Sequence, residues 1–347
     1  MTINWGLIGC GRIANNRVIP EGILNAKNSN LIGVSDVIED RAKFTSKKFN
    51  TKKFNNSKEL FEDKSIDAVY IATPPSSHSE IAISAANSRK NILTQKPIGL
   101  DAKQALGMLE ACKNNDVKLG VGYMMRFHGA HQKIQSLIKE GIIGKPLGIR
   151  IRYSVWSPPT NIGNEVDEYG SWIHEPKISG GGPMMDMGVH AIDLMLMFLG
   201  KIKTVASFCD TLLHDYDVED TATCLFKFEN GAQGILETYM SVPNFNGRRI
   251  IEIYGSEAIL VAENTIFQLP SGDLFLYKKK NNGFENSTPE IISYEQDNMY
   301  LKEIELFSDA IINNNNPPID GSDGYHVQSV VDAVFKSSRQ KQYIEIT

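Results

Sequence analysis

Short apolar runs alternate with amphipathic segments along the first third of the chain. The runs lie at residues 5–9, 31–36, 67–73, 91–95 and 117–123. The segment between the last two has helical periodicity and begins with Asp101 and Gln104 at the spacing of a capping box. Continuous apolar strands separated by helices are typical of a parallel sheet that is covered on both faces. The pattern therefore predicts a doubly wound α/β domain over residues 1–123.

The pattern changes after residue 124. A helical segment at 131–141 leads into runs with a two-residue period, which predict strands. The stretch 221–240 contains two such runs joined by Asn230-Gly231, a pair that suits a tight hairpin turn. Further strands are expected at 248–255 and 272–280, and further helices near 301–313 and 324–338. Residues 124–347 are thus predicted to form an α+β domain with a predominantly antiparallel sheet.

Composition and charge exclude several classes of function. The 347 residues are 41% hydrophobic and 22% charged, and this length favours two domains. The net charge of −5 gives no broad positive field for nucleic acid or anionic lipid. The basic runs Arg248-Arg249 and Lys278 to Lys280 are interpreted as solvated hairpin faces. We expect neither nucleic-acid binding nor, without an apolar run of about 18 residues, a membrane span.

The cysteines and the N-terminus indicate the compartment. The four cysteines are scattered without a Cys-x-x-Cys pair, which indicates neither a zinc knuckle nor a disulfide framework. The chain enters its first strand at once, with no pattern typical of a signal peptide. We therefore expect a soluble protein of the cytoplasm.

A dinucleotide-binding fingerprint follows the first predicted strand. Gly9, Gly11 and Ala14 form the pattern Gly-x-Gly-x-x-Ala, in which the first glycine permits a tight turn and the second lets the backbone approach a pyrophosphate. The amides of Arg12 and Ile13 would then open the following helix toward the anion. A glycine-rich turn without a ligand is the alternative. The strand before it and the helical segment after it favour a Rossmann nucleotide-binding domain.

An acidic residue ends the second predicted strand. Asp36 lies roughly 20 residues beyond the fingerprint, where a carboxylate can bind the ribose hydroxyls of the cofactor. It would repel the 2′-phosphate of NADP, so NAD is the expected cofactor. NADP remains possible because Arg41 could offset part of this repulsion. An ordinary turn aspartate is the alternative.

Lys96 lies where the strand predicted at 91–95 gives way to a loop. Ligands of an open parallel sheet bind beyond the carboxyl ends of its strands. Lys96, and Thr73-Pro74 at the end of the preceding strand, would therefore face the nicotinamide end of a dinucleotide. A solvated surface charge is the alternative for Lys96.

Two acids and a histidine share one face of an apolar segment at 183–199. Asp186, His190 and Asp193 have the spacing i, i+4, i+7 of a helix face. Asp186 and His190 could be a buried core pair or a general base with its orienting acid. A zinc site is a further alternative, but no third histidine at ligand spacing supports it, so no metal is expected.

Taken in order, five motifs resemble the Gfo/Idh/MocA oxidoreductase family over essentially the whole chain. They are GCGRIA, ATPPSSH, QKP, GYMMRF and SGGGPMMDMGVHAIDL. The resemblance implies an NAD(P)-dependent dehydrogenase of sugars, inositols and related polyols. It also implies homodimers or homotetramers that form through the open face of the second sheet.

The resemblance assigns roles to individual residues. Lys96, Asp186 and His190 would be catalytic: the histidine would exchange a proton with a substrate hydroxyl, the lysine would stabilise the charge on that oxygen, and the aspartate would hold the imidazole or a neighbouring hydroxyl. A cis bond before Pro97 would aim the lysine at the substrate. Asp193 would be structural. Further cofactor contacts are expected from His78 and Gln95, and substrate contacts from Tyr123, Arg126 and Trp172, with His174 beside the last.

Two positions depart from the family pattern. Gln95 replaces the usual glutamate before the lysine, and Met124 replaces a frequent asparagine, which would make the mouth of the site less polar. Two other functions are alternatives to the dehydrogenase. A non-catalytic sensor of dinucleotide or sugar would not need the three catalytic residues, and the retained Lys-Pro pair favours simple dehydrogenation over an NAD-dependent glycosidase.

Overall fold

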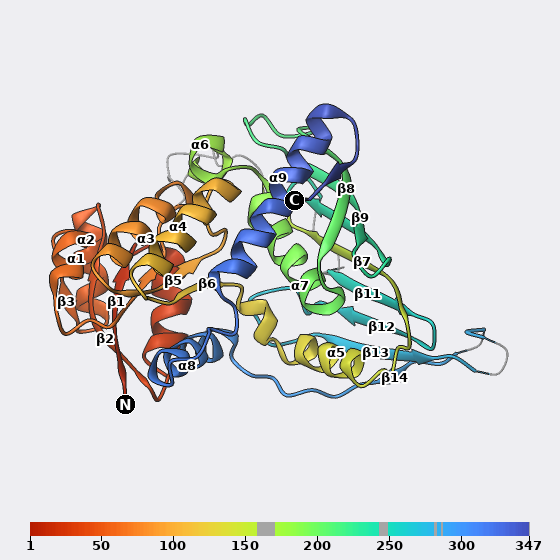
Figure 1. The fold of residues 1–347 in the computed structure, drawn as a ribbon, viewed down its shortest axis with the longest axis horizontal. Coiled ribbons are helices and arrows are strands. Elements are labelled where there is room, and N and C mark those ends of the chain that lie inside the picture. Colours follow the sequence, from red (N-terminus) through yellow and green to blue (C-terminus); the bar gives the residue numbers. More distant parts are fainter. Residues whose placement is uncertain (158–170, 243–248, 281–282, 286, 347) are drawn as a thin grey trace.

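The apolar runs of the first domain form a six-stranded parallel sheet with the order β3-β2-β1-β4-β5-β6 (Figure 1). Its strands are β1 (Ile3–Ile8), β2 (Ser29–Ser35), β3 (Lys52–Lys53), β4 (Ala68–Ile71), β5 (Asn91–Gln95) and β6 (Leu119–Gly122). The two-residue β3 was not predicted, because it is too short to show a period. This computed structural model describes residues 1–157, 171–242, 249–280, 283–285 and 287–346.

Helices cover this sheet, and the carboxyl ends of its parallel strands lie at one edge. They are η1 (Ala14–Ile23), α1 (Glu39–Lys48), α2 (Ser57–Glu62), η2 (Pro75–Ser77), α3 (His78–Asn87) and α4 (Ala102–Asn114). Half of the predicted capping box forms at α4. The Asp101 carboxylate accepts from the Gln104 amide at 2.8 Å, but the Gln104 side chain accepts from Leu100 N and not from the cap residue.

Within the described residues, the second sheet has nine strands in the order β14-β13-β12-β11-β7-β10-β9-β8-β15. They are β7 (Pro146–Ser154), β8 (Ile202–Asp210), β9 (Thr221–Phe228), β10 (Gln233–Tyr239), β11 (Ile250–Gly255), β12 (Ala258–Glu263), β13 (Asp273–Lys278), β14 (Glu290–Ile291) and β15 (Ile344–Glu345). The β9–β10 hairpin turns at Gly231, whose φ is +89°. The predominantly antiparallel sheet is confirmed, with one parallel pair, β7–β10.

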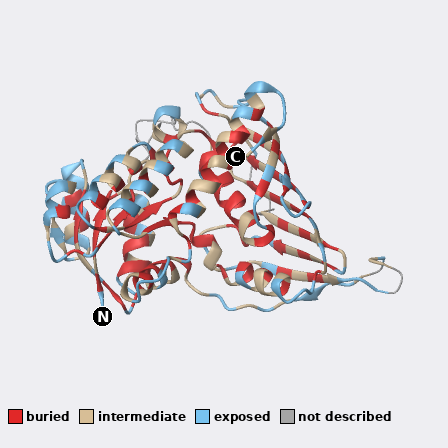
Figure 2. Cartoon of the chain, in the orientation of Figure 1, coloured by how far each residue is buried: buried red, intermediate tan, exposed pale blue. Residues whose placement is uncertain are grey.

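Helices pack on one face of this sheet and leave the other open. The helices of this half of the chain are η3 (Met124–Phe127), α5 (Gly129–Lys139), η4 (Ser171–His174), α6 (Pro176–Ser179), η5 (Met184–Gly188), α7 (Val189–Leu199), α8 (Met299–Ile312) and α9 (Gly321–Gln340). Of these, η5, α7 and α9 contact the sheet directly, whereas α8 packs on the first domain. Figure 2 shows that α7 is buried along its length between the sheet and the other helices. On the open face, Phe208 is 75% exposed and Leu225 54% exposed.

The last two helices connect the two domains. Helix α8 packs against η1 and the first sheet, where the Trp5 indole donates to Ser308 and Asn28 donates to Asp309 at 2.7 Å. Helix α9 contacts α4 and β6 as well as β8. The predicted boundary at residue 123/124 stays a prediction, and the segment near 301–313 contributes to the core of the first domain.

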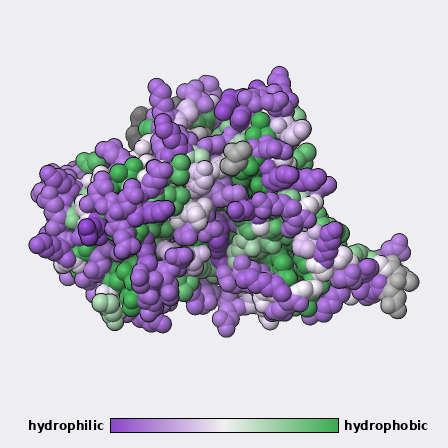
Figure 3. All heavy atoms as spheres, viewed as in Figure 1, coloured by the Kyte–Doolittle hydropathy of each residue, from purple (hydrophilic) through white to green (hydrophobic). Residues whose placement is uncertain are grey.

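One helical stretch, Pro176–Leu199, is long and apolar enough to cross a membrane, but 83% of its most apolar window is buried inside the protein. It is therefore a core helix of the second domain. The face of the molecule in Figure 3 is mainly hydrophilic, with apolar patches over both domains.

Candidate active site

The two glycines of the fingerprint have different surroundings. Gly9 has φ +96°, and a Cβ added there would lie 2.6 Å from the carbonyl carbon of Ala72, so the turn requires glycine. A Cβ on Gly11 would meet no atom of the chain within 4 Å. Gly11 therefore borders open space at the start of η1, beside Arg12 and Ile13. This arrangement fits a pyrophosphate better than a turn that merely packs.

Asp36 lies directly beside the fingerprint. Its carboxylate accepts from Cys10 N at 2.6 Å and from Ile38 N at 2.8 Å. These two bonds fix the acid at the end of β2, next to the glycine turn. The structure thus brings together the two parts of the expected nucleotide site, which lie 25 residues apart at positions 11 and 36.

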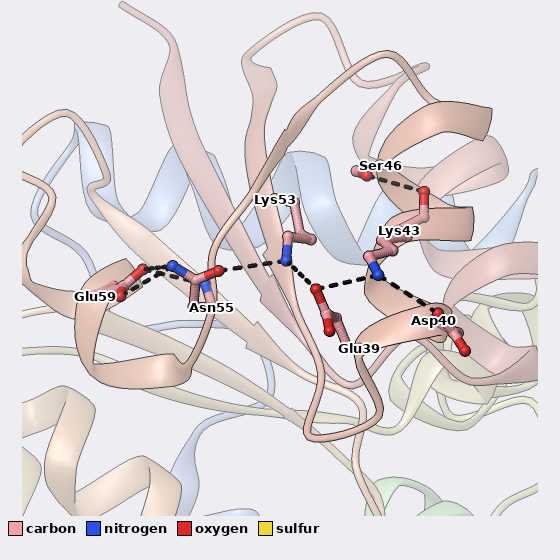
Figure 4. Close-up of polar contacts among 7 residues, drawn as sticks. All are labelled: Glu39, Asp40, Lys43, Ser46, Lys53, Asn55 and Glu59. Carbon is pink, nitrogen blue, oxygen red and sulfur yellow. Dashed lines mark hydrogen bonds and ion pairs between the residues drawn. The ribbon is translucent and has the colours of Figure 1, made fainter.

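A network of charged residues borders the acid. Glu39, in the first turn of α1, lies 3.2 Å from the Lys43 ammonium and 3.0 Å from that of Lys53. Figure 4 shows how this network continues from Lys53 to Asn55 and Glu59. Both lysines lower the pKa of Glu39. Two cations at this edge of the sheet are therefore already partnered by a carboxylate.

Lys96 joins the two domains. It follows β5 and its bond to Pro97 is cis, as expected. The ammonium donates to the Asp186 carboxylate at 2.5 Å and to the Asp186 carbonyl at 2.8 Å. The Lys96 side chain is 18% exposed and that of Asp186 55%. Loss of solvent acts to raise the pKa of Asp186, but the charge of Lys96 outweighs this and lowers it.

His190 lies one turn beyond Asp186 and is only 4% exposed. Burial, together with the charge of Lys96, lowers its pKa to about 3, so the imidazole is neutral. Its Nδ1 is enclosed and has no hydrogen-bond partner. No hydrogen bond joins it to Asp186 in the described part of the chain, where the aspartate bonds to Lys96. The ring of Tyr123 meets the imidazole edge-on at 6.0 Å.

His78 connects the ends of β4 and β5. Its Nδ1 lies 2.9 Å from Pro97 O and its Nε2 lies 2.7 Å from Thr73 O. Both ring nitrogens face carbonyl oxygens, and burial lowers the pKa of the ring. His78 is fully buried, whereas Thr73 and Pro74 are half-buried at the strand end. The geometry supports a role for His78 in holding the two loops, while its expected contact with the cofactor stays a prediction.

Hydrogen bonds hold the side chain of Gln95 through two residues that the sequence patterns did not indicate. Its amide donates to Tyr70 at 2.6 Å, and the Tyr70 hydroxyl donates to Glu303 at 3.1 Å. Burial raises the pKa of Glu303 to about 8, and its Oε1 has no partner. This chain of bonds runs from α8 to the residue before Lys96. No local signal could have found it, because Tyr70 and Glu303 lie far apart in sequence.

Arg126 is bound by two carboxylates. Its Nε donates to both oxygens of Asp193 at 2.9 Å, and its Nη2 lies 3.1 Å from Asp323. The Asp193 side chain is 1% exposed. Burial raises the pKa of Asp193 to about 6, although the guanidinium opposes this. The structural role expected for Asp193 is supported. The substrate contact expected for Arg126 stays a prediction, with its guanidinium engaged by protein.

The remaining expected residues lie at different depths. Tyr123 is fully buried, with a hydroxyl that has no partner. Met124 is 4% exposed and packs against the core, and its expected effect on the polarity of the site stays a prediction. Trp172 is half-buried in η4, where His174 stacks on Tyr216 with ring centres 4.2 Å apart. Their contacts with substrate stay predictions.

The basic pair Arg248-Arg249 was interpreted as a solvated hairpin face. Arg248 lies outside the described residues, but Arg249 is half-buried, with its guanidinium carbon 3.9 Å from the centre of the Phe267 ring. The interpretation is therefore wrong for Arg249. The local sequence gives no indication that Arg249 packs against an aromatic ring.

Comparisons with known proteins agree with this geometry. Residues 3–123 match the oxidoreductase family with an NAD-binding Rossmann fold, and residues 131–261 match the GFO/IDH/MocA C-terminal domain. The chain is 27% identical to a 1,5-anhydro-D-fructose reductase of Ensifer adhaerens, over 99% of this chain and 98% of that one. It is also 27% identical to a myo-inositol 2-dehydrogenase of Thermotoga maritima, over 98% of both chains.

Solved structures share the whole fold. A levoglucosan dehydrogenase in complex with NADH superposes with a TM-score of 0.87 at 21% identity, over 100% of both chains. A putative NADPH-dependent oxidoreductase from Desulfitobacterium hafniense gives 0.89 at 24% identity, over 100% of this chain and 98% of that one. Because family models match residues 3–123 and 131–261, which together make up most of the chain, it belongs to the Gfo/Idh/MocA family of NAD(P)-dependent oxidoreductases.

Proposed function

We propose that this protein is an NAD-dependent dehydrogenase or reductase that acts on a CH–OH group of a sugar, inositol or related polyol. The observation that carries the proposal is the contact between Lys96 and Asp186 beside a neutral, buried His190. The named activities of the anhydrofructose reductase and the inositol dehydrogenase support the substrate class.

The residues of the first domain are suited to hold the cofactor. The open space at Gly11 and the amides of Arg12 and Ile13 would receive the pyrophosphate, and Asp36 would bind the ribose. Gln95, anchored on Tyr70, would lie near the nicotinamide end. When bound, the nicotinamide accepts or gives the hydride.

The residues at the domain junction would move the proton. His190 is neutral, so it can accept the proton of a substrate hydroxyl during oxidation and return it during reduction. We assign this proton to Nε2, because Nδ1 is enclosed by protein. Lys96 would donate a hydrogen bond to the same oxygen and stabilise its developing negative charge. Asp186 holds the lysine in place, with its carboxylate and its carbonyl.

The experiment that tests this proposal supplies NAD with a panel of inositols, aldoses, anhydrosugars and sugar acids. Formation of the reduced nicotinamide is followed by absorbance for the wild type, Lys96→Ala and His190→Ala. We expect turnover of at least one class, lost in both variants. Lys103→Ala, an exposed lysine on α4, is the control that should keep full activity. Turnover that survives loss of both Lys96 and His190 would contradict the proposed mechanism.

We also propose that copies of the chain associate through the open face of the second sheet. Phe208, Leu225 and Ile235 on adjacent strands are 75%, 54% and 38% exposed, which is a large apolar content for a solvated face. Four free cysteines support the reducing cytoplasm as the compartment. Light scattering of the wild type and of Leu225→Lys tests the association, with a monomeric wild type as the contrary result.

A further inference from the structure

Arg249 is a half-buried cation that packs against two aromatic rings. It precedes β11, and its guanidinium carbon lies 3.9 Å from the centre of the Phe267 ring and 5.6 Å from that of Tyr153. Its Nε is buried and has no hydrogen-bond partner. Within the described residues no carboxylate forms an ion pair with it. Burial lowers its pKa, but a guanidinium remains charged at neutral pH.

An arginine of this kind is unusual within the same protein. Arg126 is paired with Asp193 and Asp323, and Arg150, although more exposed, is paired with Glu237. Removing a guanidinium from water is unfavourable unless an anion or hydrogen-bond acceptors replace the solvent. The two aromatic rings hold the Arg249 plane in place by cation–π contact but leave its buried Nε–H without an acceptor. The arginine is therefore oriented for an anion that the described residues do not supply.

Tyr153 relates this arginine to the proposed active site. Tyr153 lies on β7, and in the β7–β11 ladder Ile250 pairs with Arg152 and Ile251 with Ile151, so Arg249 continues the ladder beside Tyr153. The turn that carries Asp186, η5, packs on β7. Burial raises the pKa of Tyr153, the negative charge of Asp186 raises it further, and Arg249 opposes the shift. Arg249 thus packs against the ring of Tyr153, on the strand that the Asp186 turn contacts.

The other charged groups of the candidate site are already matched. Lys96 and Asp186 neutralise each other, and His190 is neutral. Arg126 already forms ion pairs with two carboxylates. Arg249, whose Nε has no partner, is therefore a cation of this region that is available to a ligand.

We propose that the substrate carries a carboxylate, which Arg249 binds while Lys96 and His190 act on a hydroxyl of the same molecule. This inference rests on the proposed function and narrows its substrate class to acids of sugars or polyols. A guanidinium matches a carboxylate in charge and in the spacing of its two N–H donors. A phosphate ester carries nearly two negative charges, which a single arginine would leave partly uncompensated.

The test compares substrates that differ by the acid group alone. D-Glucose is paired with D-glucuronate and D-galactose with D-galacturonate, and glucose 6-phosphate is added as a phosphate arm. We expect the wild type to turn over at least one acid with the higher kcat/KM. Arg249→Gln keeps the length of the side chain without its charge, and should lower kcat/KM for that acid about 10- to 100-fold, mainly through KM. Neutral sugars should change less than about twofold.

Matched variants separate charge from folding. Arg249→Lys keeps the charge and should retain more activity toward the acid than Arg249→Gln. Arg339→Gln, at the exposed end of α9, should leave both classes unchanged. Thermal melting of each NADH-bound variant, with and without D-glucuronate and D-galacturonate, reports binding without turnover. We expect at least one of these acids to stabilise the wild type but not Arg249→Gln.

Different results would contradict the carboxylate assignment and the proposed reaction. If neutral sugars are preferred and Arg249→Gln affects both classes equally, the carboxylate assignment is wrong while the dehydrogenase proposal stands. A preference for glucose 6-phosphate also overturns it. If no compound is oxidised but a sugar acid stabilises the wild type through Arg249, the carboxylate site stands and the proposed reaction fails.

Discussion

The Lys96 ammonium is held by two oxygens of one residue, the carboxylate and the main-chain carbonyl of Asp186, at 2.5 and 2.8 Å. Lys96 belongs to the first domain and Asp186 to the second. The proposed catalytic group therefore exists only when the two domains are docked, and α8 and α9 supply that docking by packing on both.

The charge of Lys96 should control the titration of His190. Burial and Lys96 lower the histidine pKa from 6.5 to about 3, whereas Asp186 acts to raise it. His190 is therefore expected to stay unprotonated from neutral pH to well below pH 6, in ¹³C-histidine NMR of the wild type assigned with His190→Gln. In Lys96→Met its pKa should rise, and in Asp186→Asn it should fall. A wild-type His190 that titrates near its ordinary value would contradict this account.

Substitution of the two fingerprint glycines should separate folding from cofactor binding. Gly11→Ala places a methyl group in space that no chain atom occupies, so its melting temperature should stay within a few degrees while NADH affinity falls by at least about tenfold. Gly9→Ala combines φ +96° with a backbone clash and should destabilise the fold itself. Melting and NADH fluorescence titration measure both. Equal NADH affinity in Gly11→Ala and wild type would rule out the pyrophosphate position.

Asp36 should determine the choice between NAD and NADP. Its carboxylate is fixed beside Cys10 N and would repel a 2′-phosphate. Asp36→Ser should therefore shift the ratio of NADPH to NADH affinity toward NADPH by about tenfold or more. Asp40→Ser, whose parent side chain is 93% exposed on α1, should leave the ratio unchanged. A wild type that prefers NADPH would remove the ribose role from Asp36.

Arg126 should be more important for stability than for substrate recognition. Removing it leaves Asp193, 1% exposed, without its bidentate partner, and breaking a buried pair costs about 3–5 kcal/mol. Arg126→Met should lower the free energy of unfolding in urea by this amount. Arg126→Met combined with Asp193→Leu should recover part of the loss, because no buried charge is left behind. If the single variant unfolds like wild type but loses substrate affinity, the arginine binds substrate after all.

Glu303 should make the protein less stable as pH rises. Its pKa of about 8 in the folded state exceeds the ordinary 4.5, so the folded state retains a proton that the unfolded state loses between these values. Its contribution to stability falls from about pH 4.5 to pH 8 and is constant above that range. Glu303→Gln cannot ionise and should gain stability relative to wild type between pH 5 and pH 8, by roughly 1.4 kcal/mol per pH unit at most.

Urea unfolding at pH 5, 6.5 and 8 measures that difference for Glu303→Gln. Glu305→Gln, on the same helix, is the control that should show a pH-independent offset. A constant difference for Glu303→Gln would mean that the carboxyl is ionised in the folded protein at all three values.

Local patterns predicted much of the fold. Residue period and turn residues located the strands of the first sheet other than β3, the Asn230-Gly231 hairpin and the two C-terminal helices. The parallel pairing of β7 with β10 was not predicted, because it joins strands about 80 residues apart and depends on the crossover between them. Local prediction is also incomplete at short range. Only half of the capping box at Asp101 forms, because the amide of Leu100 competes for the Gln104 side chain.

The sequence by itself determined the elements that depend on local chemistry: the left-handed turn at Gly9, the acid at the end of β2, and a lysine at the end of β5 followed by a proline. Tertiary structure alone decided which charges are neutralised. Arg126 is engaged by Asp193 and Asp323, whereas Arg249 has no ion-pair partner among the described residues. The physical reason is distance along the chain. Hydrogen bonding and side-chain period act over a few residues, but the partner of a charge depends on which distant segments pack together and which of them exclude water.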